Sequence, residues 1–159
     1  MPHAIDMLKE DHEKVKTLFQ QYEAAGDRAY KTKQRIAEEV FTELEVHTTL
    51  EEEIFYPAVK RKADQDGQAL VAEALEEHHV VAVLMEELKS LDPKDERYDA
   101  KFKVLMENVA HHIEEEEEEM LPDAEEILRE QLERLGEQMQ GRKEELMGVI
   151  PHAKRGDRR

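Results

Sequence analysis

Residues 47–57, HTTLEEEIFYP, and residues 112–122, HIEEEEEEMLP, share one framework. Each begins with a histidine, carries a glutamate four residues later and reaches a proline ten residues after the histidine. The two pairs are His47 with Glu51 and His112 with Glu116. Four residues are about one turn of an α-helix, so the imidazole and the carboxylate of each pair lie on one helix face. Both pairs continue stripes of apolar residues, and we therefore expect them to face the interior.

Two further histidines repeat this arrangement at long range. His12 precedes His47 by 35 residues, and His78 precedes His112 by 34. Each lies in a stripe of its own, at a position where an apolar residue would be expected. The chain is thus predicted to be a doubled helical hairpin, with a histidine on the first helix of each hairpin and a histidine–glutamate pair on the second.

The apolar residues recur in steps of three and four along four segments, and no segment alternates for long enough to make a strand. The second stripe is Ile36, Val40, Leu44, His47, Glu51, Ile54 and Ala58, and the third is Val71, Leu75, His78, Val81, Met85 and Leu88. Short connections between long helices favour antiparallel neighbours. We therefore predict an all-α fold, an up-down antiparallel four-helix bundle.

A further amphipathic segment follows Pro122 and contains Gly136 and Gly141, where a helix would break. We expect it to form an additional C-terminal helix packed on the outside of the bundle. The predicted organisation is therefore a four-helix bundle at residues 1–122, a C-terminal helical extension at 123–150 and a flexible basic tail at 151–159.

Charge and composition exclude several classes of function. Forty acidic against 23 basic residues give a net charge of −17 at pH 7, which argues against binding to nucleic acid or to an anionic membrane surface. Without cysteine, the chain has no disulfide, iron–sulfur cluster or thiol nucleophile. The sequence shows neither a membrane-spanning run nor a signal-peptide pattern, so we expect a cytoplasmic protein.

Helix lengths place the four histidines and the two glutamates at one height of the bundle. Two buried carboxylates would be costly there, and bound cations remove that cost. With both glutamates bridging, two octahedral ions would keep about four of roughly twelve positions for oxide, water or a small molecule. The mixed donor set suits iron or manganese, and zinc by ligand type. The predicted metal ligands are His12, His47, Glu51, His78, His112 and Glu116.

At these residues the sequence resembles the hemerythrin-like (HHE) cation-binding family. The resemblance rests on residues 5–12, IDMLKEDH, on Glu77-His78 and on the two histidine–glutamate–proline segments, and it covers roughly residues 2–148. It implies a non-haem centre of two oxo- or hydroxo-bridged iron ions, with the histidines as terminal ligands and the glutamates as bridges. The small ligands that it implies are oxygen, hydrogen peroxide and nitric oxide.

Two features distinguish the sequence from the oxygen-carrying hemerythrins. Those proteins have a fifth histidine on the third helix, whereas here Ala74 and Ala82 stand four residues to either side of His78. Their fourth-helix carboxylate is an aspartate, whereas here it is Glu116. The pattern is similar to the bacterial branch of the family, which implies catalase-like consumption of hydrogen peroxide. The alternative is non-enzymatic binding or sensing of oxygen or nitric oxide, or iron handling, at the same centre.

The residues leave some assignments open. His79 could replace His78 as a ligand, and His111 could replace His112, although their own stripes fit less well. A metal-free helical domain that binds partners through its acidic surface is a further interpretation. Both a monomer and a homodimer are compatible with the sequence.

Other polar side chains are expected to have structural or surface roles. Tyr22 and Tyr56 could each donate a hydrogen bond near the site, but packing at the ends of the bundle is the preferred interpretation. The glutamates of residues 114–119 other than Glu116 are expected to lie on a solvated helix face, together with those at 52 and 53.

Overall fold

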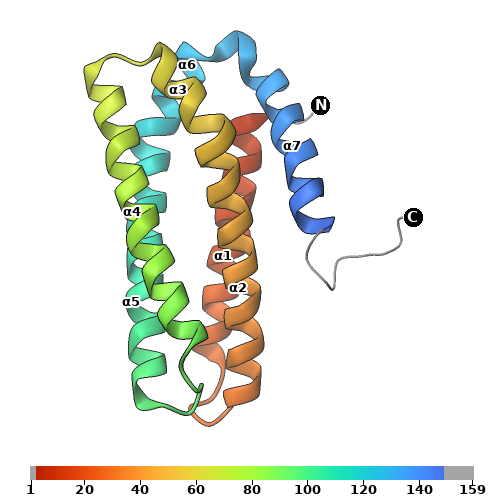
Figure 1. Ribbon diagram of the computed structural model, residues 1–159, viewed down its shortest axis with the longest axis vertical. Coiled ribbons are helices and arrows are strands. Elements are labelled where there is room, and N and C mark those ends of the chain that lie inside the picture. The colour runs from red at the N-terminus through yellow and green to blue at the C-terminus, as the bar shows by residue number, and fades with distance from the viewer. Residues whose placement is uncertain (1–2, 149–159) are drawn as a thin grey trace.

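The computed structural model describes residues 3–148, which Figure 1 shows as a bundle of long helices with one further helix at its side. The α-helices are α1 Ala4–Ala24, α2 Tyr30–Leu50, α3 Tyr56–Lys62, α4 Gln65–Lys89, α5 Glu96–Glu115, α6 Leu121–Ile127 and α7 Leu132–Gly148. These described residues form no β-strand, which confirms the predicted all-α class. None of their helices combines the length and apolar composition that a membrane span needs.

The bundle consists of two antiparallel hairpins. One hairpin is α1 with α2, and the other is α4 with α5 (Figure 1). A π-helical turn, Glu51–Phe55, carries α2 into α3, and a second one, Glu116–Met120, carries α5 into α6. The predicted up-down antiparallel bundle is thus confirmed, with each second helix of a hairpin extended beyond its π-helical turn.

The connection between α3 and α4 is tight, and its residues explain why. Asp64 caps α4, because its Oδ1 accepts a hydrogen bond from the backbone N–H of Gly67 at 2.9 Å. A Cβ atom at position 67 would lie only 2.6 Å from the Cβ of Ala63. Only glycine therefore permits this close approach of the two helices.

The apolar interior is divided into two clusters along the bundle. The upper cluster lies toward α3, α6 and α7 and contains Phe55, Leu50 and Met139, all fully buried. The lower cluster lies toward the α1–α2 and α4–α5 connections, where the rings of Tyr22 and Phe102 stack with centroids 4.0 Å apart. His12 on α1 and His78 on α4 fall between members of the two clusters, and the ligands predicted on α2 and α5 lie close to the same boundary. The bundle therefore holds a polar layer between two hydrophobic cores.

The two π-helical turns have the same construction. The backbone N–H of Tyr56 bonds to the carbonyl of Glu51, five residues earlier, and the N–H of Leu121 bonds likewise to Glu116. A proline follows at once in each case, and proline has no N–H to donate and crowds the carbonyl four residues before it. The wider turn shifts the helix phase, so the fully buried residue is Phe55 and the predicted Ile54 is only partly buried.

The apolar stripe of α4 differs from the prediction at one position. Leu75 is 40% exposed, whereas Ala74 is buried at 3%. The inward face steps from Val71 by three residues to Ala74 and then by four to His78. The prediction of Leu75 as a core residue was therefore wrong by one position of helical phase.

The C-terminal helix α7 lies beside α1 and α2 (Figure 1). It runs through Gly136 and Gly141, so the expectation of a break at these glycines was wrong. The helical direction instead changes before α7, at the 3-10 turn Arg129–Gln131. Leu132, Leu135 and Met139 bury one face of α7 in the upper cluster, and this packing outweighs the helix-weakening effect of glycine. The predicted tail, residues 151–159, lies outside the described residues.

Candidate metal centre

The structure brings all six predicted ligands together in the polar layer. Each of the four long helices contributes one histidine, and each π-helical turn begins with one glutamate: His12 on α1, His47 on α2, His78 on α4, His112 on α5, and Glu51 and Glu116. All six are buried, and Glu51 is completely inaccessible. Their role as metal ligands stays a prediction, whereas their convergence is observed.

The imidazoles form two pairs. The ring centroids of His12 and His47, from the first hairpin, are 5.0 Å apart. Those of His78 and His112, from the second hairpin, are 4.9 Å apart. The doubled hairpin of the sequence thus becomes two histidine pairs that face each other across the bundle.

Each glutamate connects one pair to the other. Glu51 places Oε2 3.2 Å from His47 Nε2 and Oε1 3.0 Å from His78 Nε2. Glu116 places Oε1 3.1 Å from His12 Nε2 and Oε2 3.5 Å from His112 Nε2. Every imidazole therefore has a carboxylate oxygen facing its Nε2 atom, and each carboxylate contacts both hairpins. This is the arrangement required of two carboxylates that bridge two neighbouring cations.

The opposite ring nitrogen of each histidine is also bound to a carboxylate. The Nδ1 partners are Glu117 for His12, Asp11 for His47, Glu52 for His78 and Glu77 for His112, at distances from 2.5 to 2.9 Å. A carboxylate at Nδ1 favours the tautomer in which that nitrogen carries the proton. When a ring is deprotonated for metal binding, its lone pair then lies on Nε2 and points into the centre.

Four buried atoms of the centre have no hydrogen-bond partner: His12 Nε2, His47 Nε2, Glu51 Oε2 and Glu116 Oε1. Buried polar atoms are seldom left in this state. The same four residues place ligand atoms within 4.8 Å of one another, and Glu51, His78 and His112 form a second such group. A metal ion in each group would accept these lone pairs, so the residues present fit a pair of metal ions.

The electrostatics of the centre also favour cations. Burial alone would raise the pKa of Glu51, but His47 and His78 outweigh it and hold that pKa well below the usual range. Burial would lower the pKa of His112, yet its contacts with Glu116, Glu51 and Glu77 raise it to about 9. Positive charge among these groups is thus stabilised by the carboxylates that surround it.

Tyr56 lies at the centre, and this corrects the expectation that it packs at the end of the bundle. Its hydroxyl oxygen is 2.5 Å from Glu116 Oε2 and 3.1 Å from Glu51 Oε1, and it is within 3.4 Å of the Nε2 atoms of His78 and His112. In a regular α-helix, residues 51 and 56 would point about 140° apart. The π-helical turn brings them to one side, and nothing in the apolar pattern revealed it.

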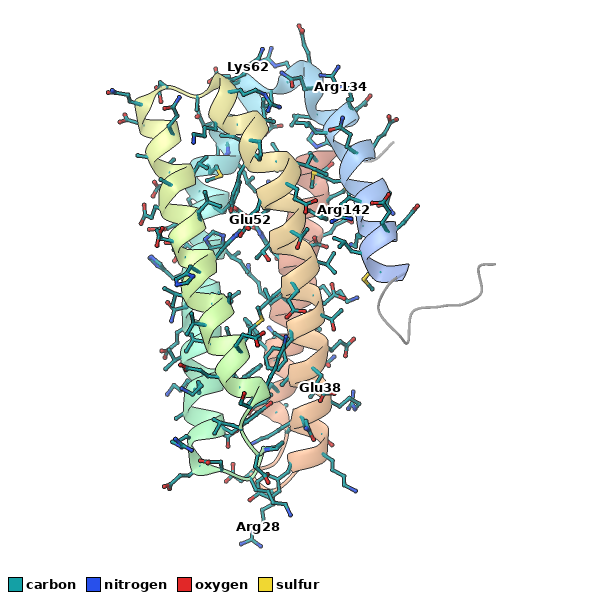
Figure 2. All side chains as sticks on the ribbon, in the orientation of Figure 1. Arg28, Glu38, Glu52, Lys62, Arg134 and Arg142 are labelled. Atoms are coloured by element: carbon teal, nitrogen blue, oxygen red, sulfur yellow. The ribbon has the colours of Figure 1, made fainter. Side chains whose placement is uncertain are left out.

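The carboxylates at Nδ1 were not predicted. Glu52 is exposed, as expected, yet it also binds a histidine of the centre, whereas Glu117 is only partly exposed. Glu52, labelled in Figure 2, binds His78 from the edge of the bundle, and Glu117 binds His12. A sequence signal for these partners does exist. Each of the four directly precedes or follows a predicted ligand in the sequence: Asp11, Glu52, Glu77 and Glu117.

The alternative histidines point away from the centre. His79 is exposed, and the side chain of His111 is 63% exposed and pairs with Glu115 on the surface. His111, Glu115 and Glu77 form a third group of donor atoms, but Glu77 is already bound to His112. The structure thus gives His78 and His112 the inward positions.

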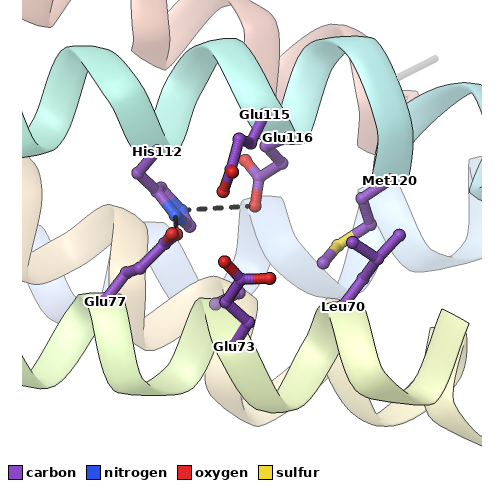
Figure 3. Close-up of a pocket in the computed structure, with 8 residues that line it drawn as sticks. Leu70, Glu73, Glu77, His112, Glu115, Glu116 and Met120 are labelled. Atoms are coloured by element: carbon purple, nitrogen blue, oxygen red, sulfur yellow. Dashed lines mark hydrogen bonds and ion pairs between the residues drawn. The ribbon is translucent and has the colours of Figure 1, made fainter. Parts of the chain in front are cut away.

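Two cavities adjoin the polar layer. In Figure 3, Glu73 and Glu77 of α4 and Glu115 of α5 point into the space between these helices, and His112 and Glu116 line the same pocket. The second cavity lies against the imidazoles and has a volume of about 30 Å³, enough for one or two water-sized molecules. Its other walls are mainly apolar, with Val15, Leu44, Val81, Val109 and Ile113 among them.

Comparison with known proteins agrees with this architecture. The family model described as "Hemerythrin HHE cation binding domain" matches residues 3–124. An uncharacterised hemerythrin-like protein of Schizosaccharomyces pombe is 27% identical over 131 residues, and a DNA nickase of Nostoc is 27% identical over 115 residues. The alignments cover 82% and 70% of this chain but only 64% and 30% of those two proteins.

A solved structure is also similar. It is the crystal structure of a hemerythrin HHE cation-binding domain-containing protein from Mycobacterium kansasii, with a TM-score of 0.78 and 27% sequence identity. The match covers 92% of this chain and 88% of that one. It therefore extends beyond residues 3–124 of the family match and takes in part of the C-terminal extension.

Proposed function

The chain belongs to the hemerythrin HHE cation-binding domain family, and from this we propose that it is a non-haem di-iron protein that binds hydrogen peroxide and consumes it in a catalase-like reaction. The observation that carries the proposal is the pair of donor groups linked by both glutamates. Either group alone would form a site for a single ion. Glu51 belongs to both groups, and Glu116 of the first group lies 3.5 Å from His112 of the second. This sharing of carboxylates favours two ions close together.

The proposed ligands follow from the observed contacts. His12 and His47 would hold one ion and His78 and His112 the other, with Glu51 and Glu116 contributing one oxygen to each. Imidazole and carboxylate donors suit iron. When bound, two iron ions would pass electrons from one hydrogen peroxide molecule, which is oxidised to oxygen, to a second, which is reduced to water.

Three features of the protein support a reactive centre rather than a closed structural one. Ala74, one turn before His78, is buried and lines the pocket of Figure 3 without offering a donor. The hydroxyl of Tyr56 lies among the donors of the second group and holds a proton, because burial and then the charges of Glu51 and Glu116 raise its pKa. It can therefore donate a hydrogen bond inside the centre. The six predicted ligands alone leave positions open on two octahedral ions.

Non-enzymatic binding or sensing of oxygen or nitric oxide is the second candidate. The observation that favours it is the small, largely apolar cavity against the imidazoles. Its volume of about 30 Å³ suits a diatomic molecule, and its valine, leucine and isoleucine walls exclude larger polar ligands. Hydrogen peroxide also fits this volume, but the apolar walls favour the less polar diatomic molecules.

Oxygen evolution distinguishes the two. Hydrogen peroxide is added to the iron-loaded protein in an oxygen electrode cell. Sustained evolution of one oxygen molecule for two peroxide molecules consumed would support the catalase-like function. A reversible spectral change on exposure to oxygen or nitric oxide, without turnover of peroxide, would contradict it and favour the binding role. The variant Glu51→Gln removes the charge of one proposed bridging carboxylate. Its matched control is Glu53→Gln, because Glu53 is exposed and touches none of the proposed ligands.

A further inference from the structure

Helix α7 reaches the centre through a single lysine. Lys143 Nζ lies 3.2 Å from Asp11 Oδ1, and the other oxygen of Asp11 lies 2.9 Å from His47 Nδ1. Asp11, on α1, is buried with 8% of its surface exposed, and its carboxylate contacts both His47 of α2 and Lys143 of α7. Lys143 and Asp11 therefore connect α7 to the imidazole of His47. Helix α7 lies beyond residues 3–124 of the family match.

This connection makes one histidine different from the other three. Among residues 3–148, no lysine or arginine forms an ion pair with the Nδ1 carboxylates of the other histidines, which are Glu52, Glu77 and Glu117. Asp11 alone has a cation on the oxygen that does not face its histidine. On the Nδ1 side of the four histidines, α7 therefore introduces an asymmetry.

The physical effect of this cation follows from the hydrogen bond. A carboxylate that accepts the Nδ1 proton of an imidazole makes the opposite nitrogen a stronger donor to a metal. An ammonium group on the far oxygen draws electron density away from that hydrogen bond and weakens the effect. The Nε2 atom of His47 should therefore be a weaker donor than it would be beside an unpaired Asp11.

We propose that Lys143 is a positioning residue that tunes the metal affinity and reduction potential of the His12–His47 half of the centre through Asp11. The inference rests on the proposed metal centre, but it does not depend on peroxide as the substrate. The C-terminal helix α7 would thus have a role at the centre in addition to its packing in the upper cluster.

The neighbouring residue provides a matched control. Arg142 Nε lies 2.8 Å from Glu53 Oε1, so it also ties α7 to the bundle (Figure 2). Glu53 touches no histidine of the centre. Arg142→Gln and Lys143→Gln therefore remove the same charge and a comparable attachment of α7, but only the second alters Asp11.

The first test uses Zn²⁺ alone, because zinc takes nitrogen and oxygen ligands and has no redox chemistry. Its affinity is measured by calorimetry at fixed pH for the wild type and for each variant. Asp11→Asn should weaken binding by about tenfold or more, as expected for loss of a carboxylate beyond a ligand histidine. Lys143→Gln should change affinity in the opposite direction, Arg142→Gln should not change it, and Lys143→Arg should restore the wild-type value.

The second test is the midpoint potential of the iron-loaded protein. Lys143→Gln should lower the potential, because a stronger His47 donor favours the ferric state, and Asp11→Asn should raise it. Equal zinc affinities and equal potentials for Lys143→Gln and Arg142→Gln would overturn the inference, even if Asp11→Asn fails to fold. If the predicted shifts occur without peroxide turnover, the inference stands and the catalase-like function fails.

Discussion

Each predicted ligand histidine is bound at Nδ1 by a carboxylate that is the sequence neighbour of another predicted ligand. Asp11 directly precedes His12 but binds His47, and Glu117 directly follows Glu116 but binds His12. The six ligand positions could be predicted because four-residue spacing is a local property of a helix. The Nδ1 partners adjoin these ligands in the sequence, but which carboxylate binds which histidine could not be predicted, because consecutive residues on a helix point about 100° apart and contact a different neighbour.

Loss of one of the two proposed bridging carboxylates is expected to prevent iron from binding at the proposed centre. Glu51→Gln removes the charge and one donor oxygen while keeping the volume of the side chain. We expect far less than the wild-type iron content after purification, measured by elemental analysis, and the loss of any absorption band of the di-iron centre. Glu53→Gln should keep both. A normal iron content in Glu51→Gln would contradict the proposed ligand set.

Tyr56→Phe is expected to change the centre without unfolding the protein. The variant keeps the aromatic ring but leaves Glu116 Oε2 without its 2.5 Å partner. Loss of a buried hydrogen bond to a carboxylate should lower the free energy of unfolding of the metal-free protein by about 1–3 kcal/mol, measured by urea denaturation. The absorption spectrum of the iron-loaded variant should also shift.

Tyr22→Phe is the control for this prediction. Tyr22 also donates to a carboxylate, Asp99, at 2.6 Å, but it belongs to the lower hydrophobic cluster. Its loss should reduce stability and leave the spectrum unchanged. Identical spectra for the two variants would show that the hydroxyl of Tyr56 does not act on the centre.

At the scale of the elements, the periodicity of the sequence predicted the long helices but not their π-helical turns. The apolar stripe through His47 and Glu51 was extended with the ordinary period of an α-helix, which placed Ile54 inward. The structure inserts an extra residue in the turn, so Phe55 and Tyr56 take the interior positions instead. The repeated proline ten residues after each histidine was visible in the sequence, and in retrospect it marks where the helix widens.

The C-terminal helix is expected to stabilise the fold through its apolar face. Met139 is fully buried in the upper cluster. Met139→Ala should lower the free energy of unfolding by about 2–5 kcal/mol, the usual cost of a large cavity in a core. Gln138→Ala, one residue earlier on the exposed face, should change it by no more than about 0.5 kcal/mol. Equal urea midpoints for the two variants would mean that α7 contributes little to the core.

The whole molecule is organised around its polar layer. Two hydrophobic cores are separated by four imidazoles and two carboxylates, and the doubled hairpin brings ligands from distant parts of the sequence to one height. This level of organisation was predictable because the repeat spacing and the helix lengths together determine it. The net charge of −17 gave no guide to the site, because only two of the forty acidic residues are proposed ligands.

Removal of metal should destabilise the entire bundle, because the metal-free centre leaves buried polar atoms without partners. A ligand that binds only the folded state adds about 4 kcal/mol when it is present at a thousand times its dissociation constant. The melting temperature should therefore fall on treatment with a chelator and recover when iron is returned. An unchanged melting temperature would contradict metal binding between the two cores.

The number of iron ions bound per chain distinguishes a di-iron centre from a single-ion site and from a metal-free bundle. The protein is produced under aerobic, iron-replete conditions, and the metal content is determined by elemental analysis against an accurate protein concentration. Two donor groups joined by Glu51 and Glu116 predict two iron ions per chain. A content of less than about one iron ion per chain, with no other metal present in a larger amount, would contradict a di-iron centre.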